Sequence, residues 1–144
     1  MKKIIIVFIF IINHIVALDK DSTIKIYNDI MKSIFVKYNH IYVYVPNKEY
    51  HQILKLSKVI SIVDDINKAS IAVVTDKLDL KHIKKNNPNM MLFVTKEKLL
   101  FEDKTIIGAF YWKKGRSQLI FIKDRLDKYH IKLPTEYNQF IIEL

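Results

Sequence analysis

The hydrophobic positions along the chain alternate between helical spacing and short continuous runs. Apolar residues at helical spacing run from Tyr27 to Tyr38 and predict a helix whose N-cap is Asp21 or Ser22. Runs of β-branched and aromatic residues follow, and such runs are typical of strands. They are IYVYV at 41–45, VISIV at 59–63, SIAVVT at 70–75 and MMLFVT at 90–95. The run at 70–75 hardly alternates, which predicts a strand covered on both faces.

Short polar segments separate these predicted elements. Asn47 follows the first strand and is predicted to cap a second helix, since its short side chain can accept from a free amide of the first turn. The polar segment after the strand at 70–75 ends at Asn86-Asn87-Pro88, a strong stop signal. A helical turn is expected over 96–101.

The last third of the chain predicts a β-hairpin. Two β-rich runs, 105–112 and 117–122, are joined by a short loop in which Gly115 is expected to take a positive φ. A short helix over 123–129 follows, and Thr135 is expected to cap a final helix after Pro134. The pattern predicts an α/β fold, a layered mixed sheet with helices on both faces and a C-terminal hairpin followed by short helices.

The first 17 residues predict a signal peptide. Lys2 and Lys3 precede an apolar run from Ile4 to Ile12, and a small residue, Ala17, stands at the expected cleavage point. The alternative is a retained membrane anchor. The apolar run is only about 15 residues long, however, and a membrane-spanning helix needs about 20. We therefore expect export to a bacterial periplasm and a single α/β domain over 18–144.

Composition leaves two explanations for the positive charge. The chain has 144 residues, a net charge of +9, 22 Lys but only 2 Arg, and 25 Ile with 9 Asn. This bias is typical of an AT-rich genome, or it indicates an anionic partner such as nucleic acid, anionic lipid or an acidic protein surface. Nucleic-acid-binding proteins favour Arg because its planar guanidinium makes paired hydrogen bonds, so the scarcity of Arg makes nucleic acid a less favoured partner.

The sequence offers no catalytic constellation. It has no Cys, and its two Gly exclude GxGxxG and Walker phosphate loops. No two of His40, His51, His82 and His130 stand at metal-ligand spacing. Asp residues near strand ends, at 64, 65, 76 and 79, could hold a cation or act in acid–base chemistry, but Asp is commoner in turns because it hydrogen-bonds locally. We therefore expect no enzyme activity, no cofactor and no metal.

Two candidate binding sites remain. The segment 108–116 holds the only Trp, three consecutive aromatics and three cations, and predicts a partner-binding edge. Its candidate contacts are Tyr111, Trp112, Lys113, Lys114 and Arg116. The alternative is an aromatic strand packed on a helix, followed by a solvated turn; alternation then places Phe110 and Trp112 on one face and Tyr111 on the other.

The second candidate site lies at the ends of two predicted strands. Thr75, Asp76, Thr95 and Lys96 directly follow them, where an α/β sheet can hold a small anion.

The C-terminal third carries a recognisable motif. It consists of a strand with Phe110 five residues before Gly115-Arg116, a strand with Leu119 and Phe121, a short helix, Ile131-x-Leu133 and a closing helix over 135–142. This motif and the order of the elements resemble the YfiR-like family of small exported bacterial proteins. The resemblance implies a periplasmic repressor that binds the outer sensor domain of a membrane diguanylate cyclase or histidine kinase and so limits cyclic-di-GMP signalling. A homodimer is compatible with it. The alternative function is a periplasmic small-ligand (anion) binding module without catalysis.

Overall fold

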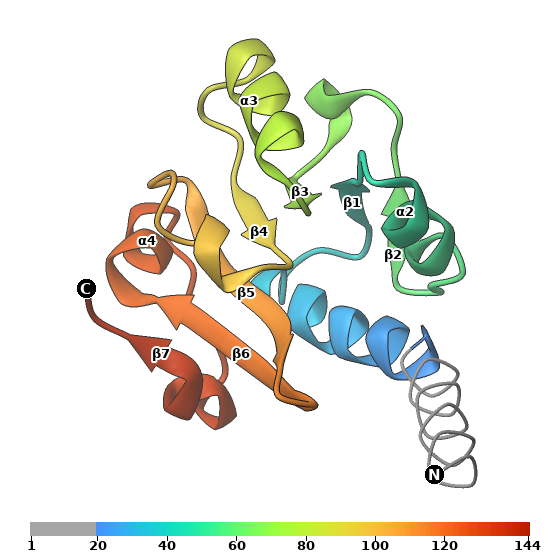
Figure 1. Ribbon diagram of the computed structural model, residues 1–144. Helices are drawn as coiled ribbons and strands as arrows, with labels where there is room; N and C mark the ends of the chain where they lie inside the picture. Colours follow the sequence, from blue (N-terminus) through green and yellow to red (C-terminus); the bar gives the residue numbers. More distant parts are fainter. Residues whose placement is uncertain (1–19) are drawn as a thin grey trace, which may run out of the picture.

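The computed structural model describes residues 20–144, which form a mixed seven-stranded sheet with helices on both faces (Figure 1). The predicted signal peptide, 1–17, lies outside the described residues. The strands are β1 (Ile41–Tyr44), β2 (Ile60–Ile62), β3 (Ile71–Val74), β4 (Leu92–Val94), β5 (Ile106–Lys113), β6 (Arg116–Ile122) and β7 (Ile141–Ile142). The helices are an N-terminal helix over 20–34, α2 (Lys48–Leu54), α3 (Lys77–Asn86), α4 (Lys123–Lys128), and the 3₁₀ helices η1 (Ile66–Lys68), η2 (Glu97–Leu99) and η3 (Thr135–Phe140). The α/β class and the terminal hairpin predicted from the sequence are confirmed.

The sheet combines a parallel half with an antiparallel addition. Its order is β2-β1-β3-β4-β5-β6-β7, and the five strands from β2 to β5 in this order are mutually parallel. Strand β6 returns antiparallel to β5, and the short β7 pairs parallel with β6. The carboxyl ends of β3, β4 and β5 therefore meet at one edge of the sheet, and their amino ends meet at the opposite edge.

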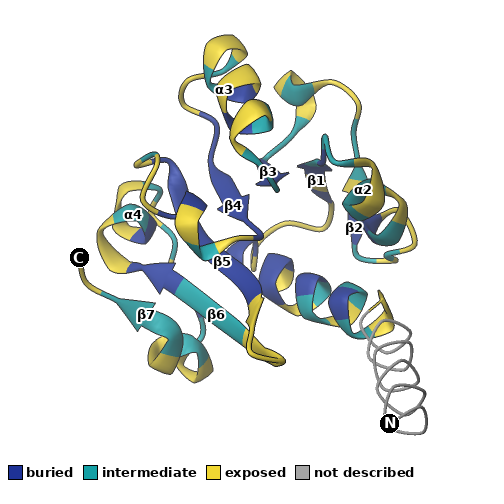
Figure 2. Cartoon of the chain, viewed as in Figure 1, coloured by how far each residue is buried: buried dark blue, intermediate teal, exposed yellow. Residues whose placement is uncertain are grey.

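Two apolar layers cover the two faces of this sheet. All four residues of β3 are fully buried, with Ile71 and Val73 packed in one layer and Ala72 and Val74 in the other (Figure 2). The N-terminal helix, α2 and α4 contribute to the first layer, and α3 and η2 to the second. This explains why the sequence of β3 does not alternate, because a strand covered on both faces has no polar side.

Gly108 allows β5 and β6 to approach closely. A Cβ built at this position would lie 2.5 Å from the Ile120 carbonyl oxygen and 2.9 Å from a ring carbon of Phe121. The β4–β5 register also shifts by one residue beside it, between Leu92 and Phe93, so the pairing of these two strands is irregular here. Glycine is the residue that fits here, since any side chain would collide with the backbone of the neighbouring strand.

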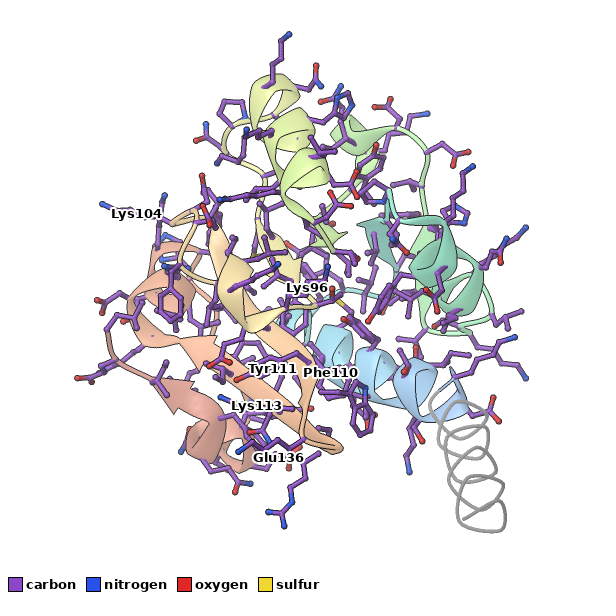
Figure 3. The ribbon with its side chains drawn as sticks, in the orientation of Figure 1. Lys96, Lys104, Phe110, Tyr111, Lys113 and Glu136 are labelled. Atoms are coloured by element: carbon purple, nitrogen blue, oxygen red, sulfur yellow. The ribbon has the colours of Figure 1, made fainter. Side chains whose placement is uncertain are left out.

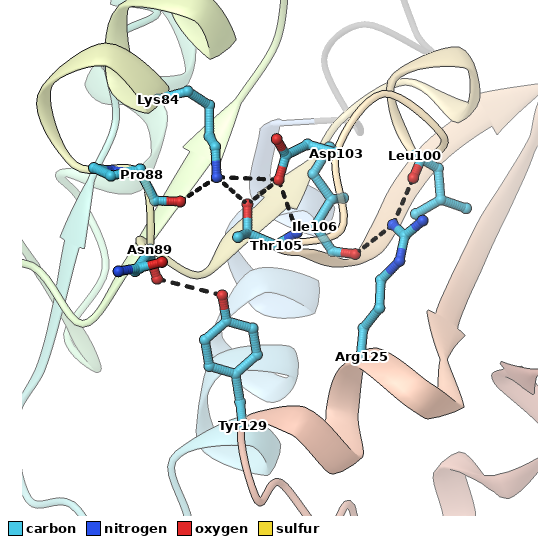
Figure 4. A network of polar contacts seen from close by, with 9 residues as sticks. All are labelled: Lys84, Pro88, Asn89, Leu100, Asp103, Thr105, Ile106, Arg125 and Tyr129. Carbon is cyan, nitrogen blue, oxygen red and sulfur yellow. Dashed lines mark hydrogen bonds and ion pairs between the residues drawn. The ribbon is translucent and has the colours of Figure 1, made fainter.

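Polar contacts tie the loop before β5 to its neighbours (Figure 4). Lys84 Nζ lies 3.1 Å from Asp103 Oδ1 and donates to the Thr105 hydroxyl and to the Pro88 carbonyl. The Thr105 amide and hydroxyl both donate to Asp103, at 2.8 and 2.6 Å. Burial would raise the pKa of Asp103, but these hydrogen bonds and the Lys84 charge outweigh it and lower that pKa. The cluster fixes where β5 begins.

Several predicted caps and ends are corrected by the structure. Asn47 does cap α2 and accepts from the Tyr50 amide at 3.0 Å. In contrast, the N-terminal helix already includes Lys20, so neither Asp21 nor Ser22 is its N-cap. The predicted final helix is a 3₁₀ helix that Thr135 does not cap, and Ile141 belongs to β7. Packing of this short segment against β6 decides its conformation, which local propensity does not encode.

Candidate functional site

The β5–β6 hairpin carries the candidate partner-binding residues at its turn. Lys113 pairs with Arg116, so the connection has only two residues, Lys114 and Gly115. Both have positive φ, 52° and 76°, which is the signature of a type I′ turn. The positive φ of Gly115 is confirmed, whereas no sequence feature predicted a positive φ at Lys114. Such a turn matches the twist of the strands and leaves the Lys114 side chain exposed.

The aromatic residues before the turn alternate as predicted. Tyr111 belongs to one apolar layer and is 8% exposed, and Phe110 belongs to the other and is 5% exposed. Trp112 lies on the same side as Phe110, with ring centroids 6.1 Å apart, but is 45% exposed. Phe110 and Tyr111 therefore anchor the strand, and Trp112 leaves much of its ring available for contact.

A groove of about 290 Å³ brings the two predicted sites together. It is lined by Tyr111, Trp112 and Lys113 from β5 and by residues 95–98, which follow β4 and include the start of η2. Figure 3 labels Lys96, Tyr111 and Lys113 among them. The strand register explains why these two segments meet. Val94 pairs with Ala109, and the residues that follow each of them continue side by side. Thr95 and Lys96, predicted as ligand contacts, thus lie in the same groove as part of the predicted partner-binding set.

Glu97 is a residue of this groove that the sequence analysis missed. Its Oε2 lies 3.4 Å from Lys113 Nζ, and the Tyr111 hydroxyl donates a hydrogen bond to its carboxylate. Burial raises the pKa of Tyr111, and the charge of Glu97 and this hydrogen bond raise it further. Lys96 and Lys98 also line the groove, so cations outnumber the single carboxylate. The sequence does contain a feature that points to Glu97, because it stands between two lysines shortly after a buried strand.

The remaining predicted ligand residues have other roles. Asp76 caps a helix, and the hydroxyls of Thr75 and Thr95 are buried. The Asp76 side chain accepts from the Asp79 amide at 2.8 Å and so caps α3. Together with Lys96 it lines a small recess of about 150 Å³. The Thr75 and Thr95 hydroxyl oxygens are buried without a hydrogen-bond partner among the described residues. These hydroxyls face the interior, so the four residues do not form one shared ligand site.

Lys114 and Arg116 extend the positive surface beyond the groove. Both are exposed at the hairpin turn, and neither makes an ion pair with any residue of the described range. Their charges are therefore available to an external group, in contrast to Lys113, which is partly neutralised by Glu97.

Other polar residues near strand ends have local structural roles. Asp65 caps η1 by accepting from the Asn67 amide at 2.9 Å. Burial and the neighbouring Asp76 charge raise the pKa of Asp79, which lies in the first turn of α3. Over residues 20–144, no group of three or more His, Asp or Glu is arranged to hold a metal ion. In the same range, no helix has the length and apolarity that crossing a membrane requires.

The fold and groove together define an α/β protein with a basic, aromatic edge. No family model matches the chain, and no curated protein matches it. Among solved structures, it is similar to a conserved domain protein from Vibrio cholerae O1 biovar El Tor str. N16961, with 12% sequence identity and a TM-score of 0.56. The match covers 83% of this chain and 59% of that one, so the chain corresponds to about three fifths of its neighbour's length. At this identity the similarity concerns the fold alone.

Proposed function

We propose that this protein is a periplasmic regulatory binding protein whose hairpin edge holds an acidic surface of a membrane sensor. The observation that carries the proposal is the convergence of the exposed Trp112 with Lys96, Lys98 and Lys113 in one groove. An exposed Trp is a typical anchor of protein interfaces, and lysines around it attract an acidic partner. The resemblance to the YfiR-like family supports a diguanylate cyclase or a histidine kinase as that sensor.

The charge distribution favours an acidic protein over nucleic acid as the partner. Lys114 and Arg116 add two unpaired cations next to the groove, and Trp112 is the exposed aromatic at this edge. A single stacking ring does not make the ladder of aromatics that tracks a nucleic-acid strand. Opposite charges accelerate association with an acidic partner and make it sensitive to salt.

The proposed mechanism is a shift in the populations of the sensor's states. A binder that prefers the inactive state of the sensor's outer domain stabilises that state by its difference in affinity for the two states. Release of the binder then frees the sensor. The protein itself needs no catalytic group for this role, and we assign it none, nor any cofactor.

The proposal is tested first by capture of the partner. The tagged protein is used to isolate binding proteins from envelope extract at low and high salt, and captured proteins are identified by mass spectrometry. The outer domain of a captured membrane sensor is then purified and titrated against the protein, with the fluorescence of the single Trp as the signal. Because that residue is Trp112, binding at the proposed edge changes its emission directly.

Charge reversal distinguishes the hairpin edge from general positive charge. Lys113→Glu with Lys114→Glu is expected to weaken binding of the sensor domain by about tenfold or more. The matched control reverses Lys68 and Lys81, two exposed lysines on η1 and α3, and is expected to leave affinity nearly unchanged. Unaltered affinity in the hairpin variant, or equal losses in both variants, contradicts the proposed site.

A second candidate function is the binding of a small anion at the same edge of the sheet. It is favoured by the recess of about 150 Å³, which has room for an ion the size of phosphate and which Lys77, Lys96 and Lys98 line. Asp76 and Glu102 also line it, and Glu102 pairs with Lys77 at 3.1 Å, so Lys96 and Lys98 are the cations available to an anion. A ligand at 100 times its dissociation constant stabilises the folded state by about 2.7 kcal/mol. A rise in melting temperature with inorganic phosphate, absent in Lys96→Gln, supports this function, and an unchanged melting temperature excludes it.

A further inference from the structure

A second cavity lies at the edge of the sheet opposite the hairpin turn. It has a volume of about 710 Å³ and is lined by residues 34–38, Ser70, Met91 and residues 129–132. These segments are the end of the N-terminal helix, the starts of β3 and β4, and the chain that leaves α4. The cavity is therefore formed by parts of the chain that are far apart in sequence and meet only in the fold.

The size of this cavity is that of a small-molecule site. Ligand cavities in proteins measure about 300–1,000 Å³, a range that includes 710 Å³. The groove beside Trp112, at about 290 Å³, and the recess beside Asp76, at about 150 Å³, lie below that range. An organic ligand is thus expected at the amino edge of the sheet rather than at the carboxyl edge.

The lining combines an apolar surface with cations and contains no carboxylate. Ile34, Phe35 and Met91 supply buried apolar walls, and Val36 is an aliphatic side chain that is 65% exposed. Lys37 and Lys132 bring positive charge, His130 adds ring nitrogens, and neither Asp nor Glu is among the lining residues. A ligand that complements this lining has an apolar body and an anionic group.

The end of α4 removes an obstacle to binding an anion here. Free carbonyls at a helix C-terminus would repel it. Here the Ile131 amide donates to the Leu126 carbonyl at 2.9 Å and the His130 amide to the Asp127 carbonyl at 3.0 Å. With His130 at φ 56°, this is the Schellman arrangement, which satisfies the Leu126 and Asp127 carbonyls within the chain.

The cavity continues into a groove with both apolar and cationic residues. A neighbouring groove of about 420 Å³ shares Phe35, Val36 and Tyr38 with it and extends to Lys32 and Lys58. An elongated surface of this kind suits a chain-like ligand better than a compact one.

We propose that this cavity binds an amphiphilic monocarboxylate of the fatty-acid type. The aliphatic chain packs against Phe35, Val36 and Met91, and the carboxylate is held by the cations of Lys37 and Lys132. The site is separate from the hairpin edge, and its existence does not depend on the proposed sensor partner.

The test is calorimetric titration of the purified protein with decanoate, kept below the concentration at which it forms micelles. Decanoate is expected to bind at least tenfold more tightly than decanol, which has the same chain but no charge. Lys37→Gln with Lys132→Gln is expected to weaken decanoate binding about tenfold and to leave decanol binding unchanged. The matched control, Lys68→Gln with Lys81→Gln, removes the same charge elsewhere and should retain full affinity.

Two further variants keep the test independent of folding. Glycine adopts positive φ without strain, so His130→Gly removes the ring while retaining the turn, and it is expected to weaken decanoate binding without lowering the melting temperature. Val36→Ser changes an exposed side chain and is expected to weaken decanoate and decanol alike.

Several results would overturn the proposal. They are the absence of decanoate binding at millimolar concentration, equal affinities for decanoate and decanol, and equal losses in the cavity and control variants. Sedimentation with phosphatidylglycerol vesicles that decanoate does not inhibit would indicate adsorption to a lipid surface instead. Binding of an acidic, apolar peptide but not of decanoate would assign the cavity to a protein segment.

Discussion

Arg125 offers the sharpest test of how this fold is held together. Its Nη1 donates to the Leu100 carbonyl at 2.6 Å and to the Ile106 carbonyl at 2.7 Å, and both of these residues are fully buried (Figure 4). One side chain therefore joins α4 to the end of η2 and to the start of β5. Arg125→Met keeps most of the apolar stem and removes both donated bonds.

The expected cost follows from the number and type of these bonds. A hydrogen bond from a charged donor contributes about 1.5–3 kcal/mol, and a buried carbonyl left without a donor costs about 1–3 kcal/mol. Because Arg125 is itself partly exposed, water can reach part of the site, and we expect a loss of about 2–4 kcal/mol. This is a large fraction of the 5–15 kcal/mol of unfolding free energy that is typical of a domain.

The assay is urea unfolding at neutral pH, followed by circular dichroism. Arg125→Met should lower the denaturation midpoint without changing the slope, and Arg125→Lys, which can restore one bond, should lose less. Lys81→Met, at an exposed position of α3, serves as the control for the new Met side chain and should change stability by no more than about 0.5 kcal/mol. A loss below about 1 kcal/mol in Arg125→Met would refute the reasoning, since the two carbonyls would then need no protein donor.

Three further predictions concern β5 and its flanking loops. Gly108→Ala places a Cβ 2.5 Å from the Ile120 carbonyl oxygen and should cost about 1–3 kcal/mol or more in chemical denaturation; a neutral effect would contradict the tight approach of the strands. Lys114→Asn places a residue that tolerates positive φ in the type I′ turn and should stabilise the fold by about 0.5–1 kcal/mol. The measurement is the melting temperature, and a lower melting temperature would contradict the prediction. The lowered pKa of Asp103 in the folded protein means that the stability it contributes is present above its unfolded pKa of about 3.9 and is lost as pH falls through the folded value. The difference in unfolding free energy between the wild type and Asp103→Asn should therefore shrink between pH 6 and pH 2, and a difference independent of pH would contradict this assignment.

Local sequence signals identified the strands and one helix cap correctly because short-range physics sets them. The buried strand at 70–75 follows from an apolar run without alternation, and Asn47 caps α2 through a bond to an amide three residues away. The same signals failed at the chain's last segment. Thr135 is a good capping residue, yet the segment forms a 3₁₀ helix and then β7, because pairing with β6 outweighs its weak helical preference.

The candidate site was only partly predictable for a related reason. Alternation along β5 correctly separated Phe110 from Tyr111, since side-chain period in a strand is a local property. The meeting of Lys96 with Trp112 depends on which strands are neighbours, and a single sequence carries no such information. The buried Thr75 and Thr95 hydroxyls show the limit of the argument from strand ends, because position at an edge does not fix where a side chain points.

The sequence by itself therefore determined the α/β class, the hairpin and the composition of a basic, aromatic edge. These properties depend on hydrophobic period, turn chemistry and charge, each of which acts over a few residues. The tertiary structure alone decided the strand order, the shared groove at the carboxyl edge and the cavity at the amino edge. Each of those features joins residues distant along the chain, and only the packing of the two apolar layers on the sheet brings them together.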